Sequence, residues 1–397
     1  MHTVVVGGGF GGVKTALELS KRNTGKITLI SDEPYFLHHA TLYATATGRA
    51  KAESVIQLED IFKNHGNVTV VHDKMKSIDT ARRLVVGGKK SYHYDKLVIA
   101  IGVVTTYFNI DGMSSHSYGI KTLKEVKKFK KHLHDELTLE KRFDKNYFVI
   151  GAGPTGVELA GALVEYLNRI AEFHHIKHAK PRIVLVEAAD RILPRMSKTA
   201  SKKVHKQLEK QGVKILTGKM VESLDDDEIM IAGKKYPTQT AVWTSGVTNH
   251  PFFKKHADVF ELAPNGRVVV DSHMMAAPNI FVIGDNAATP YTGLAWTALR
   301  DADFVAKHLA RIRSKQPLKP ANHRSFVSGV PTGDNWAYVE KSGIYAAGWL
   351  GAWLRRRIEL NGYLELVPRQ TALAAWKAHD QYEEDCTTCK KSLDNSL

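Results

Sequence analysis

Short apolar segments alternate with longer segments of helical periodicity over most of the chain. Near its start, apolar residues 3–6 precede a helical pattern at about 12–22, and a second apolar segment follows at 27–30. Short continuous apolar runs are typical of parallel strands that are buried on both faces. Two such strands joined by a helix form a βαβ unit, so the pattern predicts one at the start of the chain.

A second unit of the same kind is predicted further along. It consists of apolar residues 147–150, a helical pattern at about 155–173 and apolar residues 183–187. Each unit also has a later apolar strand, "KLVIAIG" at Lys96–Gly102 and "TAVWTSGV" at Thr240–Val247. This alternation of strands and helices indicates an α/β protein built from two similar halves.

Further segments predict how the two halves are connected. A charged helical stretch at 121–143 precedes the second unit, and the strand "NIFVIGD" at Asn279–Asp285 and a helix at about 292–313 follow it. This order predicts that the second unit is inserted into the first. We therefore divide the chain into a first domain of residues 1–112 and 248–312, an inserted domain of residues 113–247 and a C-terminal region of residues 313–397.

A glycine fingerprint of the form G-x-G-x-x-G stands between strand and helix in both units, in "VVVGGGFGG" and "FVIGAGPTGVELAG". In such a fingerprint the first glycine permits a tight turn, the second lets the backbone approach a pyrophosphate, and the third lets helix and strand pack closely. The helix N-terminus then faces the negative charge. Two fingerprints in this context predict two dinucleotide sites. Their glycines are Gly7, Gly9 and Gly12, and Gly151, Gly153 and Gly156.

The residue that ends the second strand of each unit distinguishes the two sites. In the inserted unit it is Glu187, whose carboxylate would accept hydrogen bonds from a ribose 2′-hydroxyl and repel a 2′-phosphate. This favours NAD over NADP. In the first unit Ser31 stands at this position and Asp32 follows, and either could reach a ribose. A turn-forming role is the alternative for Asp32.

The composition is that of an ordinary globular protein, with 43% hydrophobic and 24% charged residues. No apolar run approaches the roughly 18 residues of a membrane span, and the first apolar run is the fingerprint strand rather than a signal peptide. We therefore expect a cytoplasmic location. The net charge is +15, but no nucleic-acid-binding module is present. Much of the excess lies in Arg195–Lys214, predicted to be a solvated helix with Val204 and Leu208 facing inward.

Only two cysteines are present, Cys386 and Cys389, in a polar tail where a free pair is expected. Two cysteines supply half the ligands of a structural zinc site, and no metal site is predicted. Neither lies near a fingerprint, which argues against a redox disulfide or thiol chemistry at the nucleotide sites.

The chain resembles the two-dinucleotide-binding-domain flavoproteins and, within that superfamily, the type II NADH:quinone oxidoreductases (alternative NADH dehydrogenases). The resemblance covers residues 1–312 well and the tail only in outline. It implies FAD in the first site, NADH in the second, and an NAD domain inserted into an FAD domain, both Rossmann-like. The segments that carry it are "VVVGGGFGGVKTALEL", "LYATATGRAKAESV", "VIGAGPTGVELAG", "VEAADRILPRM" and "NIFVIGDNA".

The resemblance implies a set of FAD contacts. Asp285 would bind the ribityl chain, because a carboxylate at a strand end pairs well with sugar hydroxyls, and a helix-capping role is the alternative. The backbone near Met75 would meet the adenine. The full set is Gly7, Gly9, Phe10, Gly11, Gly12, Ser31, Asp32, Met75, Ala100, Gly102, Asp285 and Ala295.

For NADH the resemblance implies a second set of contacts and a catalytic residue. Glu158 matches a glutamate that lies near the nicotinamide and the flavin in the superfamily, and we name it as catalytic. The alternative is a carboxylate that the helix dipole favours, with no further role. The NADH contacts would be Gly151, Gly153, Pro154, Thr155, Gly156, Glu187, Ser245 and Gly246.

The acceptor site departs from the family. The family pattern Ala-Gln-x-Ala-x-Gln-Gln becomes "AWTALRD" at Ala295–Asp301, so Trp296 and Arg300 replace the two key glutamines. Trp296 could stack on a quinone ring and Arg300 could donate to its carbonyl oxygen. Both are therefore candidate catalytic residues, although the family's own quinone contacts do not transfer.

The segment "GIYAAGWLGAWLRRR", Gly343–Arg357, is short and rich in aromatic residues. At helical spacing Tyr345, Trp349 and Trp353 fall in one row, and Arg355–Arg357 follow. Such a helix suits a membrane interface, with Trp at headgroup depth and Arg on anionic phosphates. A core or dimer helix is the alternative, because aromatic stripes are usually buried. We expect peripheral attachment at the cytoplasmic face of the membrane and allow for a homodimer.

The resulting hypothesis is an FAD-dependent NADH dehydrogenase that passes two electrons from NADH to a membrane quinone without pumping protons. The alternatives are a soluble NADH-dependent reductase of a small redox protein or other acceptor, and an NADH-sensing flavoprotein. Only the quinone hypothesis requires membrane association. Sulfide oxidation is disfavoured because no cysteine lies near the flavin site.

Overall fold

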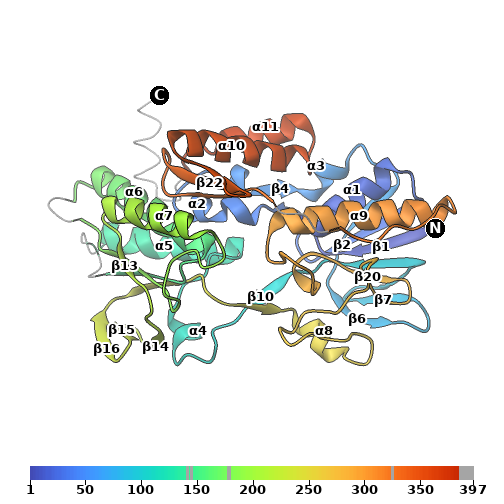
Figure 1. The fold of residues 1–397 in the computed structure, drawn as a ribbon, viewed down its shortest axis with the longest axis horizontal. Coiled ribbons are helices and arrows are strands. Elements are labelled where there is room, and N and C mark those ends of the chain that lie inside the picture. The colour runs from blue at the N-terminus through green and yellow to red at the C-terminus, as the bar shows by residue number, and fades with distance from the viewer. Residues whose placement is uncertain (140–142, 144–145, 177–179, 323–325, 384–397) are drawn as a thin grey trace.

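The structure, a computed structural model, describes residues 1–139, 143, 146–176, 180–322 and 326–383. Two α/β domains lie end to end, and the C-terminal elements lie along one side of both (Figure 1). None of the helices within the described residues is both long and apolar enough to cross a membrane.

The first domain is built on a six-stranded sheet whose strands are β1 (His2–Val6), β2 (Lys26–Ser31), β5 (Val68–His72), β9 (Lys96–Ile99), β19 (Met275–Ala277) and β20 (Ile280–Val282). Their order is β19-β20-β9-β1-β2-β5, and every neighbouring pair is parallel except β19 and β20. The helix α1 (Phe10–Lys21) joins β1 to β2 and packs against α9 (Ala295–Arg313). Late strand β20 pairs with β9, so the chain does return to complete the first sheet.

The inserted domain has a four-stranded parallel sheet made of β11 (Tyr147–Ile150), β12 (Ile183–Val186), β13 (Lys214–Leu216) and β17 (Thr240–Trp243). The strand order is β13-β12-β11-β17. Three helices accompany it: α5 (Leu123–Leu139), α6 (Pro154–Phe173) and α7 (Lys198–Lys210). Both predicted βαβ units are thus confirmed, and in α7 the side chains of Val204 and Leu208 are buried as predicted.

Smaller elements complete the two domains. The first domain adds the antiparallel pair β3 (Tyr35–Leu37) and β4 (Val55–Gln57), the antiparallel sheet β6 (Met75–Asp79), β7 (Leu84–Gly87) and β8 (Ser91–His93), and the short helices η1 (His39–Thr41), α2 (Leu42–Ala46), η2 (Lys51–Glu53), α3 (Leu58–Phe62), α8 (Pro251–Lys255) and η3 (Gly284–Asn286). The inserted domain adds α4 (Met113–His116) and the sheet β14 (Val221–Leu224), β15 (Glu228–Ile231) and β16 (Lys234–Pro237).

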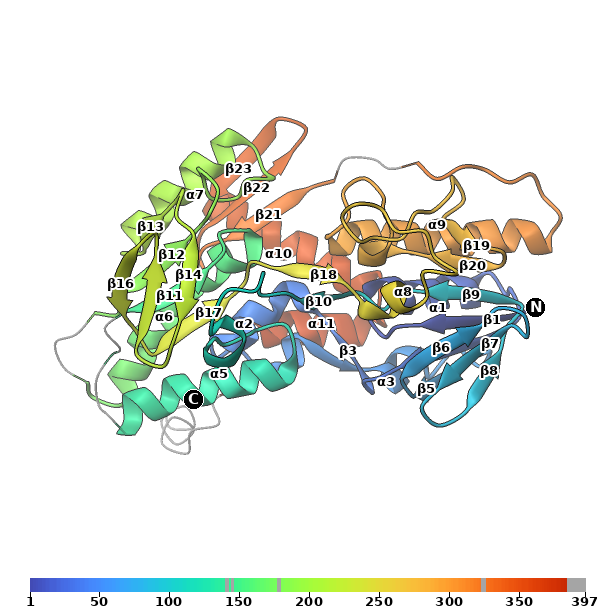
Figure 2. The same cartoon turned by 90° about the horizontal axis from the view of Figure 1, so that it is seen from below.

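The chain passes between the domains through a two-stranded antiparallel ribbon. Strand β10 (Val103–Thr105) leads into the inserted domain and β18 (Val247–Asn249) leads back, with Val103 opposite Asn249. Figure 2 shows this ribbon in the middle of the molecule. The crossing lies close to the boundaries we drew at residues 112 and 247, which remain our own division of the chain.

The C-terminal region forms an antiparallel sheet of β21 (Ser328–Pro331), β22 (Ala337–Lys341) and β23 (Ile344–Gly348), followed by α10 (Trp349–Leu364) and α11 (Arg369–Ala378). The sheet contacts α6 and α7 of the inserted domain, and α11 contacts η2 of the first. The region therefore ties the two domains together. Cys386 and Cys389 lie outside the described residues.

One prediction for this region is wrong in part. Tyr345 is not in a helical row with Trp349 and Trp353, because it belongs to strand β23, where it pairs with Glu340. The helix begins only at Trp349, after Gly348 adopts a positive φ of 77°. This conformation is readily available to glycine and turns the chain sharply between strand and helix.

Candidate functional site

Both fingerprints have the same geometry. Gly7 has a φ of 117° and Gly151 has a φ of 104°, which are conformations that L side chains rarely adopt. A Cβ at Gly12 would collide with the carbonyl oxygen of Gly7, and a Cβ at Gly156 would collide with that of Gly151. These glycines are therefore required for the turn and for close packing of helix on strand, as the pattern predicted.

The middle glycines are different, because the space beside them is open. Apart from the adjoining backbone, no described atom lies within 4 Å of the position that a Cβ would take at Gly9 or at Gly153. Each is the N-cap of its helix, α1 or α6, and no side chain caps either helix. Free backbone N–H groups at an open helix N-terminus form an anion site, so both cradles fit a dinucleotide pyrophosphate.

At the end of β2 the two candidate ribose ligands differ in their surroundings. Ser31 is buried, and its hydroxyl donates to the carbonyl oxygen of Glu33 at 2.7 Å. Asp32 is exposed, and its backbone carbonyl accepts from the ring of His72 at 2.9 Å. The carboxylate of Asp32 is thus the one that is open to a ligand.

Several of the remaining FAD candidates lie at the carboxyl ends of neighbouring parallel strands. Ala100 and Gly102 follow β9, and Asp285 follows β20 with its carboxylate accepting from the backbone N–H of Gly293 at 3.0 Å. Phe10 and Gly11 begin α1, Ala295 begins α9, and Met75 begins β6 in the adjoining antiparallel sheet. Ligands of α/β folds bind outside the carboxyl ends of the strands, and this edge meets that rule.

Sequence reasoning missed Asn286, the residue after Asp285. It is fully buried and its side chain bonds both backbone groups of Gly102, accepting at 2.9 Å and donating at 2.6 Å. It also donates to Asn249 in β18 at 2.8 Å. Asn286 therefore holds the FAD edge of the sheet against the ribbon that links the domains. Its partners are distant in sequence, so nothing local could have indicated this role.

In the inserted domain Glu187 is held by the fingerprint itself. Its two carboxylate oxygens accept from the backbone N–H groups of Ala152 at 2.7 Å and Ala189 at 2.9 Å. This fixes a negative charge beside the turn of the second fingerprint. Ser245 packs against Gly151, and Gly246 packs against the carbonyl oxygen of Thr106, the residue just after β10.

Glu158 lies in the second turn of α6, because the helix begins at Pro154. It is 7% exposed, and this burial raises the pKa of its carboxyl to about 8, an effect that the nearby Arg355 guanidinium opposes. Burial therefore dominates the pKa of Glu158, and the catalytic and helix-dipole interpretations both stay predictions. Near neutral pH the group keeps its proton, and a protonated carboxyl can act as a general acid.

Arg355 is the main correction to the predicted site. We placed it with Arg356 on lipid phosphates, but Arg355 is 9% exposed and donates to Glu359 at 3.1 Å. Arg356 donates to Glu359 at 2.9 Å and to the Trp376 carbonyl at 2.8 Å. Of the three arginines only Arg357 is exposed. Buried arginines take partners because an unpaired buried charge is costly, and here α10 and α11 supply them.

Trp296 and Arg300 lie one turn apart at the start of α9, with the Arg300 guanidinium 4.9 Å from the Trp296 ring. Phe326, from the segment before β21, lies 5.9 Å from Trp296 and 5.7 Å from Tyr291. The structure thus brings both predicted residues together and adds two aromatic rings that sequence reasoning did not include.

Exposed apolar side chains gather where β23 meets α10. Ile344 is 80% exposed, Trp349 76% and Trp353 50%, and Tyr345 and Leu350 are also exposed. The guanidinium of Arg357 lies 5.3 Å from the Trp353 ring. A cluster of large, solvent-exposed apolar side chains is typical of a surface that contacts a membrane or another protein rather than water. We call these five apolar residues with Arg357 the apolar surface.

Comparison with known proteins defines first the class and then the family. The pyridine nucleotide-disulphide oxidoreductase family matches residues 1–302. A type II NADH:quinone oxidoreductase of Mycobacterium tuberculosis is 30% identical over 356 residues, covering 82% of this chain and 74% of the relative. A second from the same organism is 29% identical over 380 residues, covering 89% and 82%. The chain belongs to the type II NADH:quinone oxidoreductase family.

Solved structures share the fold. The structure of NDH2 from Plasmodium falciparum in complex with NADH superposes with a TM-score of 0.82 at 16% identity, covering 96% of this chain and 97% of that one. The sulfide:quinone oxidoreductase of Aquifex aeolicus gives 0.78 at 20% identity, covering 100% and 95%. At these identities the likeness establishes the α/β fold with two nucleotide-binding domains and nothing about the acceptor.

Proposed function

We propose that this protein is an FAD-dependent NADH dehydrogenase that reduces a quinone at a membrane surface. The observation that carries the proposal is the pair of open glycine cradles, at Gly9 and Gly153, in a chain of this family. The first cradle, with Asp32 and Asp285, would hold FAD, and the second, with Glu187, would hold NADH. Bound FAD supplies the chemistry that accepts a hydride from NADH and passes two electrons on.

The protein's own residues would position the nucleotides and deliver the proton that quinone reduction consumes. The fixed charge of Glu187 favours NADH, because a 2′-phosphate beside this carboxylate would be repelled. Glu158 of α6 would be a protonated acid, within electrostatic range of Arg355 and Glu359 from the C-terminal region. Since each quinone takes up one proton besides the hydrogen of NADH, Glu158 would deliver that proton to the quinone oxygen.

The acceptor end is formed by Trp296 and Arg300. An aromatic ring stacks on a quinone ring, and a guanidinium donates to a quinone carbonyl oxygen. The cluster of Trp296 with Phe326 and Tyr291 offers more stacking surface than the family's glutamines would. We expect this difference to govern which quinones are accepted.

The apolar surface would hold the protein on anionic lipid from the cytoplasmic side. Tryptophan side chains suit the headgroup region, and Arg357 suits a lipid phosphate. Since a long-chain quinone is dissolved in the membrane, docking at this surface would bring enzyme and acceptor together. A homodimer stays a prediction.

An acceptor screen tests the proposal. The purified protein should release FAD on denaturation, oxidise NADH faster than NADPH, and reduce quinones in liposomes. Ferricyanide, oxygen and small redox proteins are the comparison acceptors. Release of no flavin would contradict the assignment of the first cradle. Fast reduction of a small redox protein with no reduction of any quinone would favour the soluble reductase instead.

A further inference from the structure

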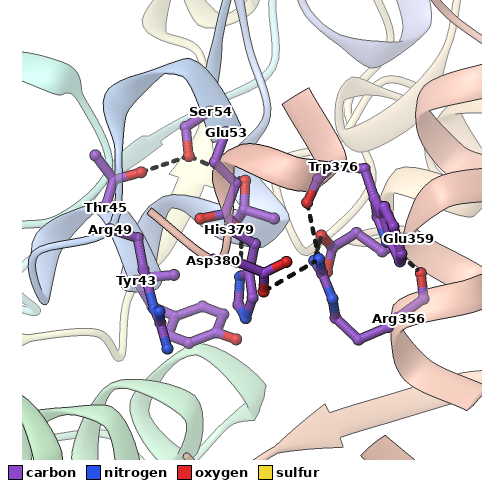
Figure 3. Close-up of polar contacts among 12 residues, drawn as sticks. Tyr43, Thr45, Arg49, Glu53, Ser54, Arg356, Glu359, Trp376, His379 and Asp380 are labelled. Atoms are coloured by element: carbon purple, nitrogen blue, oxygen red, sulfur yellow. Dashed lines mark hydrogen bonds and ion pairs between the residues drawn. The ribbon is translucent and has the colours of Figure 1, made fainter. Parts of the chain in front are cut away.

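A buried cluster of polar side chains lies where α10 and α11 meet the first domain. Glu53, at the end of η2, is fully buried, and its Oε1 lies 2.7 Å from Nδ1 of His379, just beyond α11. Its Oε2 has no hydrogen-bond partner among the described residues. Figure 3 shows Glu53 and His379 facing one another, with the Arg356–Glu359 pair to one side.

A divalent cation is a poor occupant for this cluster. The carboxylates of Glu53 and Glu359 and the ring of His379 bring ligand atoms within 4.8 Å of one another. However, both oxygens of Glu359 already accept from arginines, Oε2 from Arg355 at 3.1 Å and Oε1 from Arg356 at 2.9 Å. The guanidinium charges of Arg355 and Arg356, paired with Glu359, would repel a cation bound beside that carboxylate.

A protonated Glu53 accounts for the cluster better. Burial raises the pKa of Glu53, the His379 ring opposes that shift, Glu359 adds to it and Arg356 opposes it. A carboxyl whose second oxygen lies buried without a partner is costly as an anion and much less so with a proton on it. Glu53 and His379 can thus share or exchange a proton across a single hydrogen bond.

Tyr43 lies in α2, which packs against α6, the helix that carries Glu158. It is buried, and burial together with the charge of Glu158 raises the pKa of its hydroxyl well above the usual value, with Glu359 and Glu53 acting in the same direction. Tyr43 is therefore within electrostatic range of the active-site acid and of the buried cluster at once.

A small cavity joins Tyr43 to His379. Its volume is about 20 Å³, which is room for one water molecule. Its lining also includes Glu165, Asp334 and Tyr382. Asp334 is exposed. The cavity is thus polar, lies beside the surface, and offers the hydrogen-bond partners that a bound water needs.

We propose that Glu53, His379 and Tyr43 relay the proton that quinone reduction consumes, from this cavity to Glu158. The inference rests on the proposed function. In the overall reaction NADH, one proton and a quinone give NAD⁺ and a quinol. When Glu158 gives its proton to the quinone oxygen, the Tyr43 O–H bond breaks as the Glu158 O–H bond re-forms. In the same concerted step Glu53 and His379 return a proton to Tyr43 through the cavity, so that no tyrosinate forms, and solvent then returns a proton to them.

The relay is tested with the variants Tyr43→Phe, Glu53→Gln and His379→Asn in the full-length, FAD-loaded protein. Each removes a proton-carrying group with little change of shape. We expect quinone reduction to fall about tenfold or more and to vary with pH in a new way, on the scale of lost acid–base steps. Reduction of bound FAD by NADH and of ferricyanide should stay at the wild-type rate, because ferricyanide takes electrons without protons. Added imidazole should restore part of the quinone rate in His379→Asn.

Matched control variants distinguish loss of proton transfer from loss of packing. Tyr94→Phe removes the hydroxyl of a fully buried tyrosine whose backbone N–H bonds Arg83, and His308→Asn replaces a buried histidine that contacts His273 and Phe281. Both should reduce quinone at the wild-type rate. Relay variants that match the wild-type rate and pH profile would overturn the relay alone. Wild-type protein that reduces ferricyanide but no quinone would overturn the proposed function and the relay together.

Discussion

The two faces of α10 reverse the usual arrangement of an amphipathic helix. The inner face, against the two domains, carries the buried charges of Arg355 and Glu359. The outer face presents Trp349, Leu350 and Trp353 to solvent. A helix selected only for stability would bury its apolar residues and expose its charges. Under the proposed function, the inner face would serve the chemistry of Glu158 and the outer face would contact a nonaqueous partner.

The largest loss of stability should come from removing a buried charge on the inner face of α10. Arg355→Met leaves Glu359 with one arginine partner fewer and removes the positive charge beside Glu158. Breaking a buried ion pair typically costs about 3–5 kcal/mol, so we expect a loss of that order in the free energy of unfolding, measured in urea. Arg355→Lys keeps the charge and should lose less. Equal stability of the wild type and Arg355→Met would show that the inner charges are not coupled.

Glu158→Gln tests the acid that the inner face supports. The amide resembles the protonated carboxyl in shape but cannot deliver a proton, so quinone reduction should fall about a hundredfold. In the wild type the quinone rate should decline as pH rises through about 8, where Glu158 loses its proton. That decline should be absent in Glu158→Gln. A wild-type rate that is flat from pH 6 to 9 would contradict the role.

The same pKa has a consequence for stability. The pKa of Glu158 in the folded protein is raised to about 8 from the ordinary 4.5. The stability that this group contributes is therefore fully present below pH 4.5, where it is protonated in both the folded and the unfolded chain. It is lost progressively as the pH rises towards 8, since only the unfolded chain releases the proton in that window. The unfolding free energy of Glu158→Gln should therefore depend less on pH between these values.

On the outer face the double variant Trp349→Ser with Trp353→Ser should weaken binding to anionic liposomes at least about tenfold. Trp349 is 76% exposed and Trp353 50% exposed, so their removal forfeits well over ~100 Å² of apolar burial in the membrane, at about 25 cal/mol per Å². Ferricyanide reduction and folding stability should not change. Met220→Ser, at an exposed apolar residue beside β14, is the control. If the double variant still sediments with liposomes, the apolar surface contacts another protein copy instead.

The smallest effect is expected for Arg357→Ala. One basic residue near an anionic surface contributes about 1 kcal/mol, so liposome binding should weaken about fivefold at low salt and less at high salt. Lys234→Ala, on β16 at the opposite side of the molecule in Figure 1, should have no effect. Equal loss from both changes would mean that binding follows net charge rather than this face.

Much of the fold could be predicted because the Rossmann units are locally encoded. The strands at residues 3–6 and 147–150 are continuous apolar runs, and the glycines that follow are required by backbone geometry. When strand, glycine turn and helix follow one another within about 30 residues, few other local folds are compatible with the sequence. The C-terminal segment has no such local rule. There Tyr345 has the spacing of a helix with Trp349, but it lies in a strand because it pairs with Glu340 and the chain turns at Gly348.

The sequence by itself thus determined the two nucleotide cradles, the charge at Glu187 and the presence of an acid at Glu158, because each follows from residues close together in the chain. Only the tertiary structure decided what surrounds that acid. Arg355 reaches Glu158 from a different region of the chain, and His379 meets Glu53 across 326 positions. Contacts of this kind depend on how the C-terminal helices pack on both domains, and packing sets the burial that raises the pKa of Glu158.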